Sequence, residues 1–367
     1  MRRWWSAILL VLALAVPPAQ SATIDDAVYR RLNEALVTGH IVPRYRTLAQ
    51  ATTTLEAAAV AHCAAPSPAH LAATRRAYHG AVDAWQAIQH VRFGPIDYLS
   101  RAQRFAFWPD PRNVVGRSID EALAKRDVAA LAPGGFLHAA VPLQGFPAIE
   151  RLLFAGDAPA RLTAADEDGR FRCALMQAIA ANLARMAAEI VHDWTEGPDA
   201  YARAVTDAGP ASKIYREPKE ATLDLIKSLH LTVELVADHK LARPLGASIQ
   251  AARPRLAESW RSERSLANVR LNLAAGEAMV ATSGGAADAL VAAGDKPLAD
   301  LLRRGFAQTI ATARAIPVGL EAAVAEKAHR PAVERLRKEA AAMKALIAQR
   351  LTASLDVPIG FNALDGD

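Results

Sequence analysis

The distribution of proline constrains this fold more than any other feature of the sequence. Seven prolines fall between residues 95 and 159. Because proline ends or kinks an α-helix, that stretch can hold only short helices and loops. The flanking segments instead place apolar side chains three or four residues apart, as in Leu71, Tyr78 and Val82, which is typical of amphipathic helices. We therefore expect long helices on both sides of an irregular segment that contains Pro95, Pro109, Pro111, Pro133, Pro142, Pro147 and Pro159.

The amino-acid composition also favours a helical protein. Hydrophobic residues make up 52% of the chain, and alanine and leucine with interspersed Arg, Glu and Asp favour helix. Alternating runs of Val, Ile and Thr, which would indicate strands, are missing from the sequence. We predict an all-α fold of two packed helical-bundle units, with the N-terminal bundle and irregular segment at 23–165 and the C-terminal bundle at 166–367. The long helices are expected near residues 24–62 with a break at Pro43, 67–94, 171–194, 222–241, 265–282, 295–316 and 331–355.

The first 22 residues have the pattern of a secretory signal peptide. Arg2 and Arg3 supply positive charge, an apolar stretch runs over 8–16, and small residues follow Pro17 and Pro18. A permanent membrane anchor needs about 20 apolar residues, so an uncleaved anchor is the weaker alternative. We expect cleavage near Ala22, a periplasmic mature protein and no stable membrane span after the signal is removed.

Charge and cysteine content narrow the class of protein further. The formal net charge is only +5, and no block of five like charges occurs, so we expect no nucleic-acid partner. The only cysteines are Cys63 and Cys173. An even number of cysteines in an exported chain predicts a disulfide, and two buried free thiols are the alternative.

Four stretches of the chain together resemble the imelysin-like family. They are Trp85–Pro95 with Phe107–Asp110, Gln144–Phe154, Ala237–Lys240 with Arg243–Pro244, Ser259–Ser262 and Ser265, and the ending Gly360–Asp367. The resemblance implies one domain over about 30–355, made of two helical bundles with a candidate site between them. It also implies a cell-envelope setting, often linked to iron acquisition, and a peptidase label that comes from the family's founding member.

One position departs from the family signature Gly-x-His-x-x-Glu. Gly145 and Glu150 match it, but Pro147 stands where the histidine would be. A His and a Glu three residues apart share a helix face and could bind one metal ion. The resemblance thus suggests Glu150 as a metal ligand or pocket carboxylate, with His138 as a substitute ligand. The alternative is that Glu150 only complements the dipole of a helix that Pro147 starts.

Other candidate ligand-binding residues come from both halves of the chain. Arg92, Lys240 and Arg261 could form one basic lining for an anionic ligand. Each candidate also has a structural interpretation: Arg92 could pair with Asp110, Trp108 could belong to the core, and the rest could be surface charges and caps. The complete set is Arg92, Trp108, Asp110, Glu150, Lys240, Arg261 and Ser262.

Peptide hydrolysis has no sequence basis, since neither His-Glu-x-x-His nor Gly-x-Ser-x-Gly occurs. We expect a non-enzymatic protein that binds a small anionic ligand or a metal ion, such as iron or another divalent metal, in the service of iron uptake. The alternatives are a helical scaffold that binds an envelope protein and, second, a peptidase.

Overall fold

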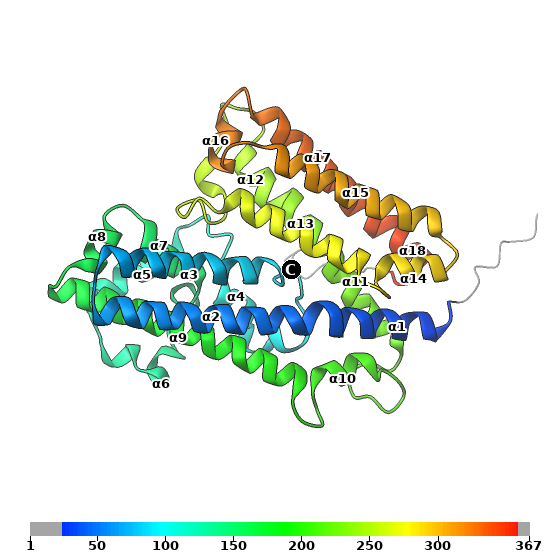
Figure 1. Cartoon of the computed structure of the whole chain (residues 1–367), viewed down its shortest axis with the longest axis horizontal. Coiled ribbons are helices and arrows are strands. Elements are labelled where there is room, and N and C mark those ends of the chain that lie inside the picture. The colour runs from blue at the N-terminus through cyan, green and yellow to red at the C-terminus, as the bar shows by residue number, and fades with distance from the viewer. Residues whose placement is uncertain (1–23, 359–367) are drawn as a thin grey trace, which may run out of the picture.

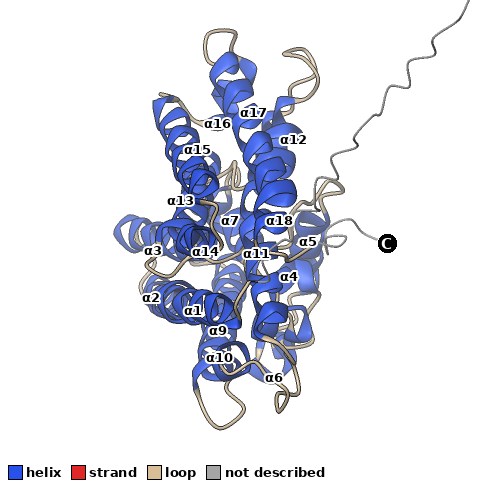
Figure 2. Cartoon of the chain, turned by 90° about the vertical axis from the view of Figure 1, so that its right-hand side faces the viewer, coloured by secondary structure: helices blue, strands red, loops and turns tan. Residues whose placement is uncertain are grey.

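A computed structural model describes residues 24–358 of the chain. Helices make up the regular structure of this part, and it contains no strand (Figures 1 and 2). The all-α prediction is therefore confirmed. The predicted signal peptide and the family-like ending at 360–367 lie outside the described residues.

The first group of helices surrounds one long helix that runs from Asp26 to Ala64 (Figure 1). It consists of α1 (Asp26–Leu36), the π-helical turn η1 (Val37–Ile41) and α2 (Val42–Ala64). The break predicted at Pro43 does not occur. Proline lacks an N–H and its ring collides with the carbonyl four residues back in a regular helix, and here the wider π turn immediately precedes it. The helices α3 (Pro68–Gln86) and α9 (Glu167–Thr195) pack along α2.

The proline-rich segment forms short helices, as predicted. Each spans a dozen residues or fewer, and several begin with proline in the first turn, where its missing N–H has no intrahelical acceptor anyway. They are η2 (Gly94–Ile96), η3 (Tyr98–Ser100), α4 (Arg101–Phe105), α5 (Val114–Lys125), η4 (Ala129–Leu131), α6 (Pro133–Phe136), η5 (Val141–Leu143), α7 (Phe146–Phe154) and α8 (Ala158–Thr163).

The second group of helices lies above the first in Figure 1. Its main members are two continuous helices with π turns of their own and two regular helices between them. Asp295 accepts a hydrogen bond from the amide of Leu298 and so caps α15, the helix predicted at 295–316. The elements of this group are α11 (Pro218–Glu234) with η6 (Leu235–Leu241) and α12 (Ala242–Leu245), η7 (Pro254–Leu256), α13 (Ser265–Ala281), α14 (Ala286–Ala292), α15 (Lys296–Ala315), α16 (Leu320–Ala325), and α17 (Arg330–Leu346) with η8 (Ile347–Leu351) and α18 (Thr352–Ser354). The short helix α10 (Tyr201–Thr206) precedes them in the chain and packs against α1 and α9 of the first group (Figure 1).

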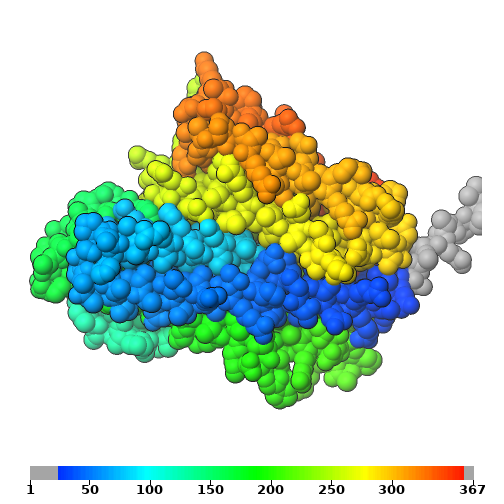
Figure 3. All heavy atoms as spheres, in the orientation of Figure 1, coloured from blue at the N-terminus to red at the C-terminus, as the bar shows by residue number. Residues whose placement is uncertain are grey.

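The two groups meet along α1, which packs against α11 and α14. In the space-filling view the blue surface of α1 lies directly against the yellow surface that contains α14 (Figure 3). One large apolar core continues through this contact, and a second, smaller core fills the far end of the upper group. The boundary predicted at residue 165 falls just before α9, whose main packing partner is α2. Helices from both sides of that position therefore share the first bundle.

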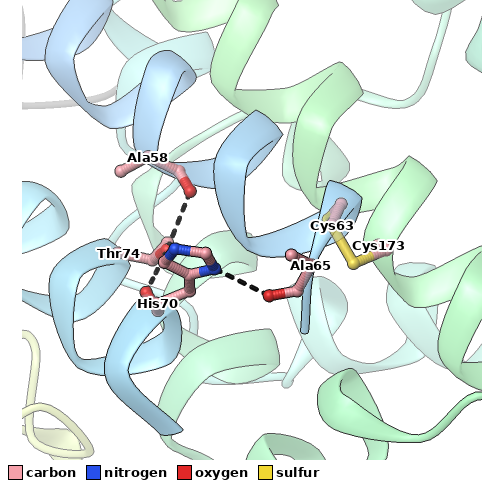
Figure 4. Close-up of a disulfide and its surroundings, with 6 residues drawn as sticks. All are labelled: Ala58, Cys63, Ala65, His70, Thr74 and Cys173. Carbon is pink, nitrogen blue, oxygen red and sulfur yellow. Dashed lines mark hydrogen bonds between the residues drawn. A yellow bond between two sulfur atoms is a disulfide. The ribbon is translucent and has the colours of Figure 1, made fainter. Parts of the chain in front are cut away.

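The predicted disulfide between Cys63 and Cys173 is confirmed (Figure 4). It joins the end of α2 to α9, with 5.5 Å between the two Cα atoms. Nearby, Thr74 donates a hydrogen bond to the carbonyl of Ala58, which ties α3 to α2 (Figure 4). The disulfide therefore covalently links two helices that are far apart in the sequence but adjacent in the first bundle.

Within residues 24–358, α9 is the one helix long and apolar enough to cross a membrane. More than half of its most apolar window is buried inside the protein. Its apolar side chains are accounted for by packing against α2, α7 and α8.

Candidate functional site

Two cavities lie at the junction of the proline-rich segment and the second group of helices. The first, called here the arginine cavity, has a volume of about 450 Å³ and is lined by residues of α3, the 106–115 loop, α7 and the 254–261 segment. The second, called the Arg92 cavity, has a volume of about 480 Å³ and lies against α11 and η6. Trp108 and Pro109 line both cavities and so form the wall between them.

Glu150 reaches the arginine cavity from α7. Position 145, just before α7, must be glycine, because a Cβ on Gly145 would lie 2.5 Å from the carbonyl oxygens of Arg104 and Phe105. Glu150 itself is buried, and its carboxylate accepts hydrogen bonds from the amide (3.0 Å) and the hydroxyl (2.8 Å) of Ser262. Burial raises the pKa of Glu150, and the hydrogen bonds from Ser262 and the charge of Arg261 oppose that rise.

Four arginines surround the same cavity: Arg151, Arg243, Arg255 and Arg261. Two of them stack on one indole, since the guanidinium carbons of Arg261 and Arg255 lie 4.2 and 5.4 Å from the ring centre of Trp260. In the described part of the chain, none of the four has a carboxylate within the 4.0 Å of an ion pair. Burial lowers the pKa of Arg261, and the charge of Arg151 lowers it further.

A buried polar cluster lies beneath the wall between the cavities. Lys240, on the π turn η6, donates hydrogen bonds to Glu258 at 2.6 Å and to Gln86 of α3 at 2.5 Å. Glu258 also accepts from Asn268 at 2.9 Å. The Lys240 amine lies 5.9 Å from the ring centre of Trp108. Lys240 is therefore satisfied by protein partners, and burial lowers its pKa while Glu258 opposes the shift.

Asp110 has a structural role in this geometry. Its two carboxylate oxygens accept hydrogen bonds from the amides of Val114 (2.7 Å) and Val115 (2.9 Å) at the start of α5. The ion pair with Arg92 that the sequence left open does not form, because Arg92 lines the other cavity and donates to the carbonyl of Gln89. Trp108 is partly buried and contributes to both linings.

The structure thus brings some of the predicted residues together and separates others. Trp108, Asp110, Glu150 and Arg261 line the arginine cavity, and Ser262 binds Glu150. The single basic lining of Arg92, Lys240 and Arg261 does not exist as expected, because these three side chains occupy the second cavity, the buried cluster and the first cavity respectively.

His138 is exposed and lines neither cavity. Among residues 24–358, no three His, Cys, Asp or Glu side chains gather in a way that could hold a metal ion. Both Ser262 donors bind one carboxylate oxygen, Oε1, of Glu150, and among the described residues no His or Cys lines the arginine cavity beside it, so the donor set at this point does not fit a bound transition metal.

Sequence reasoning missed Arg151, Arg243, Arg255, Trp260 and Glu258. Four of these lie inside or next to the family-like stretches, so a signal was present. It was not specific, because an arginine on a helix is ordinarily a solvated surface residue. Only the tertiary packing places these residues around one cavity.

Comparisons with known proteins give a consistent result. The family model described as imelysin, peptidase family M75, matches residues 41–349. The "Iron-regulated protein A" of Synechococcus elongatus is 27% identical over 234 residues, which cover 63% of this chain. This match spans 58% of the length of that relative.

Two solved structures share the fold. An imelysin-like protein from Psychrobacter arcticum 273-4 has a TM-score of 0.75 at 20% identity, covering 93% of this chain and all of the other. An iron-regulated protein A-type precursor structure from Parabacteroides distasonis ATCC 8503 has a TM-score of 0.73 at 14% identity, covering 89% and 96% of the two chains.

Proposed function

Because this chain belongs to the imelysin family, we propose that it is an exported, non-enzymatic protein that binds an anionic small ligand in the arginine cavity and serves iron acquisition. The proposal joins two kinds of support. The cavity supplies the ligand class, and the signal-like N-terminus and the name of the Synechococcus relative supply the setting.

The observation that carries the proposal is the set of arginines without ion-pair partners. Arg151, Arg243, Arg255 and Arg261 line one cavity, and among the described residues no carboxylate comes within 4.0 Å of any of them. Burial is the main cause of the lowered pKa of Arg261, and repulsion from Arg151 and Arg255 adds to it, while the charges of Glu150 and Asp110 oppose the shift. An anion in the cavity would relieve that repulsion and accept paired N–H donors.

The walls favour an organic anion with several carboxylates. Trp108, Trp260 and Phe146 provide apolar surface between the cationic groups. The carboxylate of Glu150 is already bound by the amide and hydroxyl of Ser262. Polycarboxylates also chelate iron, so a ligand of this class is compatible with a role in iron acquisition.

Calorimetric titration of the mature protein with citrate tests the proposal. We expect binding that weakens as salt is raised. Arg261→Gln and Arg151→Gln should each lower the affinity about tenfold or more, since each removes one charge-assisted pair. Arg335→Gln is the matched control, because this arginine is exposed and distant in the fold. Absence of citrate binding, or equal affinities in all variants, would exclude the arginine cavity as the site.

Metal content distinguishes the metal-binding alternative. The measurement is elemental mass spectrometry on protein exported to the periplasm and purified without chelator, with Glu150→Ala alongside. We expect no stoichiometric metal in either sample. Stoichiometric iron that is lost in Glu150→Ala would show that a metal site forms at Glu150 after all.

A further inference from the structure

The Arg92 cavity also contains an arginine without an ion-pair partner, Arg92 itself. Arg92 follows α3, and its Nε donates a hydrogen bond to the carbonyl of Gln89 at 2.7 Å. Its guanidinium carbon lies 5.6 Å from the ring centre of Trp85. Within residues 24–358 the two terminal nitrogens of Arg92 have no hydrogen-bond partner, and neither is sealed from the cavity. The side chain is therefore held in place at one end and free to bind at the other.

The carboxylates that line this cavity do not neutralise Arg92. Asp224 accepts a hydrogen bond from Tyr215 at 2.8 Å and faces Lys227 at 3.6 Å. Glu258 is occupied by Lys240. Asp97 is exposed, and like the other two it lies beyond 4.0 Å of Arg92. Arg92 is partly buried. Burial lowers its pKa, and the charges of Glu258 and Asp97 partly oppose that shift without forming an ion pair.

The remaining lining describes the shape of a suitable partner. Apolar side chains form much of the wall: Phe93, Ile96, Leu231, Leu235 and Trp108. His239 also lines the cavity, is half-buried, and has no hydrogen-bond partner on either ring nitrogen among the described residues. Burial, followed by the charge of Arg243, lowers the pKa of His239. A neutral imidazole of this kind can donate one further N–H.

From this arrangement we propose that the Arg92 cavity is a second ligand site, which binds a monocarboxylate with an apolar or aromatic body. The carboxylate pairs with the free end of Arg92, and the body packs between Phe93, Leu231 and Trp108. A second negative charge on the ligand would face Asp97, Asp224 and Glu258 and be repelled. The volume of about 480 Å³ suits a small organic molecule.

The site is distinct from the arginine cavity in chemistry as well as position. That cavity offers four arginines, which outnumber its three carboxylates, and suits a multiply charged anion. This one offers a single unpaired guanidinium, the pair of Lys227 and Asp224, two further carboxylates and apolar walls. The proposal therefore does not depend on the function proposed above, and one can fail without the other.

Calorimetric titration with phenylacetate and with phenylacetamide tests the second site in the unaltered protein. The two probes share their ring and size, but only the first carries a charge. We expect phenylacetate to bind at least about tenfold more tightly, as one charge-assisted pair predicts. Citrate at saturation should leave this binding in place. Equal affinities for the two probes would overturn the proposal. So would the absence of phenylacetate binding up to about 10 mM, because a charge-assisted pair with Arg92 should bind more tightly than that.

Variants locate the binding. Arg92→Gln should remove the preference for phenylacetate over phenylacetamide. Arg92→Lys keeps the charge but loses the planar fork, so it should retain part of the preference. Arg261→Gln, in the other cavity, should change phenylacetate affinity less than about twofold, within the usual additivity of separate sites. Far-ultraviolet circular dichroism confirms that each variant is folded. Phenylacetate binding that is lost in Arg261→Gln and unaffected in folded Arg92→Gln would place the ligand in the arginine cavity and contradict the proposal.

Discussion

At the scale of single residues, the most demanding feature is the burial of Lys240. Only 1% of its surface is exposed, so its charge must be balanced inside the protein. Glu258 supplies the balancing charge, and Gln86 and Asn268 complete the cluster. Gln86 belongs to α3 and the other three residues to the second group of helices. The cluster therefore couples the two groups through polar contacts as well as apolar packing.

Replacing this lysine tests that coupling. Lys240→Met should lower the free energy of unfolding by about 3 kcal/mol or more, because Glu258 is left as a buried carboxylate without its cation. Denaturant unfolding followed by circular dichroism measures the loss. Lys344→Met is the control, since Lys344 pairs with Asp238 at a partly exposed position and should cost less than about 1 kcal/mol. Similar losses of unfolding free energy in both variants would mean that the buried pair of Lys240 and Glu258 stabilises the fold no more than the partly exposed pair does.

A second residue-scale feature is the pair of buried histidines, His40 on η1 and His90 after α3. Their Nε2 atoms are 2.9 Å apart, so at least one ring must be neutral. Burial, with Arg44 and Arg92 nearby, lowers the pKa of His90 to about 3. Burial first, and then His90 and Arg44, lowers the pKa of His40. Both rings are thus neutral near pH 7.

This pair predicts a loss of stability in acid. The unfolded chain takes up protons near pH 6.5, whereas folded His90 does so only near pH 3. Its contribution is therefore complete above pH 6.5 and is lost as pH falls toward 3, by about 5 kcal/mol at most. His90→Asn should flatten unfolding free energy against pH in this window, with exposed His138→Asn as the matched control. An unchanged slope in His90→Asn would show that His90 does not titrate differently on folding.

At the scale of elements, π turns interrupt three long helices, at Val37–Ile41, Leu235–Leu241 and Ile347–Leu351. Each adds a residue to one helical turn and so shifts the side chains that follow it around the axis. The first carries His40 and the second carries Lys240. Two of the three π turns thus carry buried polar groups that contact residues lining the cavities: His40 contacts His90, and Lys240 contacts Glu258.

The start of α5 depends on one candidate site residue. Asp110→Ala should lower the free energy of unfolding by about 1–2 kcal/mol, since two amides of the first turn lose their acceptor. Asp110→Asn keeps one accepting oxygen and should cost less. Thermal unfolding of both variants measures the difference. If instead Asp110→Ala keeps full stability and only citrate affinity changes, Asp110 contacts the ligand and does not cap the helix.

At the scale of the whole molecule, the disulfide is a covalent constraint between distant parts of the chain. Cys63 and Cys173 are separated by 110 positions. On the chain-entropy account, closing a loop of this length stabilises the fold by roughly 4–5 kcal/mol. The double variant Cys63→Ser, Cys173→Ser should therefore show a lower unfolding midpoint than the oxidised protein. Adding reductant to the unaltered protein should reproduce that shift, and reductant should not affect the double variant. A double variant as stable as the oxidised protein would contradict the entropic contribution.

The long helices, the short elements of the proline-rich segment, the disulfide and the family could all be predicted from the sequence. These depend on local rules: apolar spacing, proline and cap positions, and the presence of only two cysteines. Even so, the break expected at Pro43 was wrong, because a π turn relieves the clash that proline causes.

The distribution of the charged residues could not be predicted from the sequence and follows from helix packing. Arg92, Lys240 and Arg261 look alike in the sequence, yet packing places them in two cavities and one buried cluster. Arg151, Arg243 and Arg255 gather around Arg261 although they come from separate segments. The physical reason is that a charge acquires its partner, or lacks one, through distances set by helix packing, and no local pattern encodes those distances.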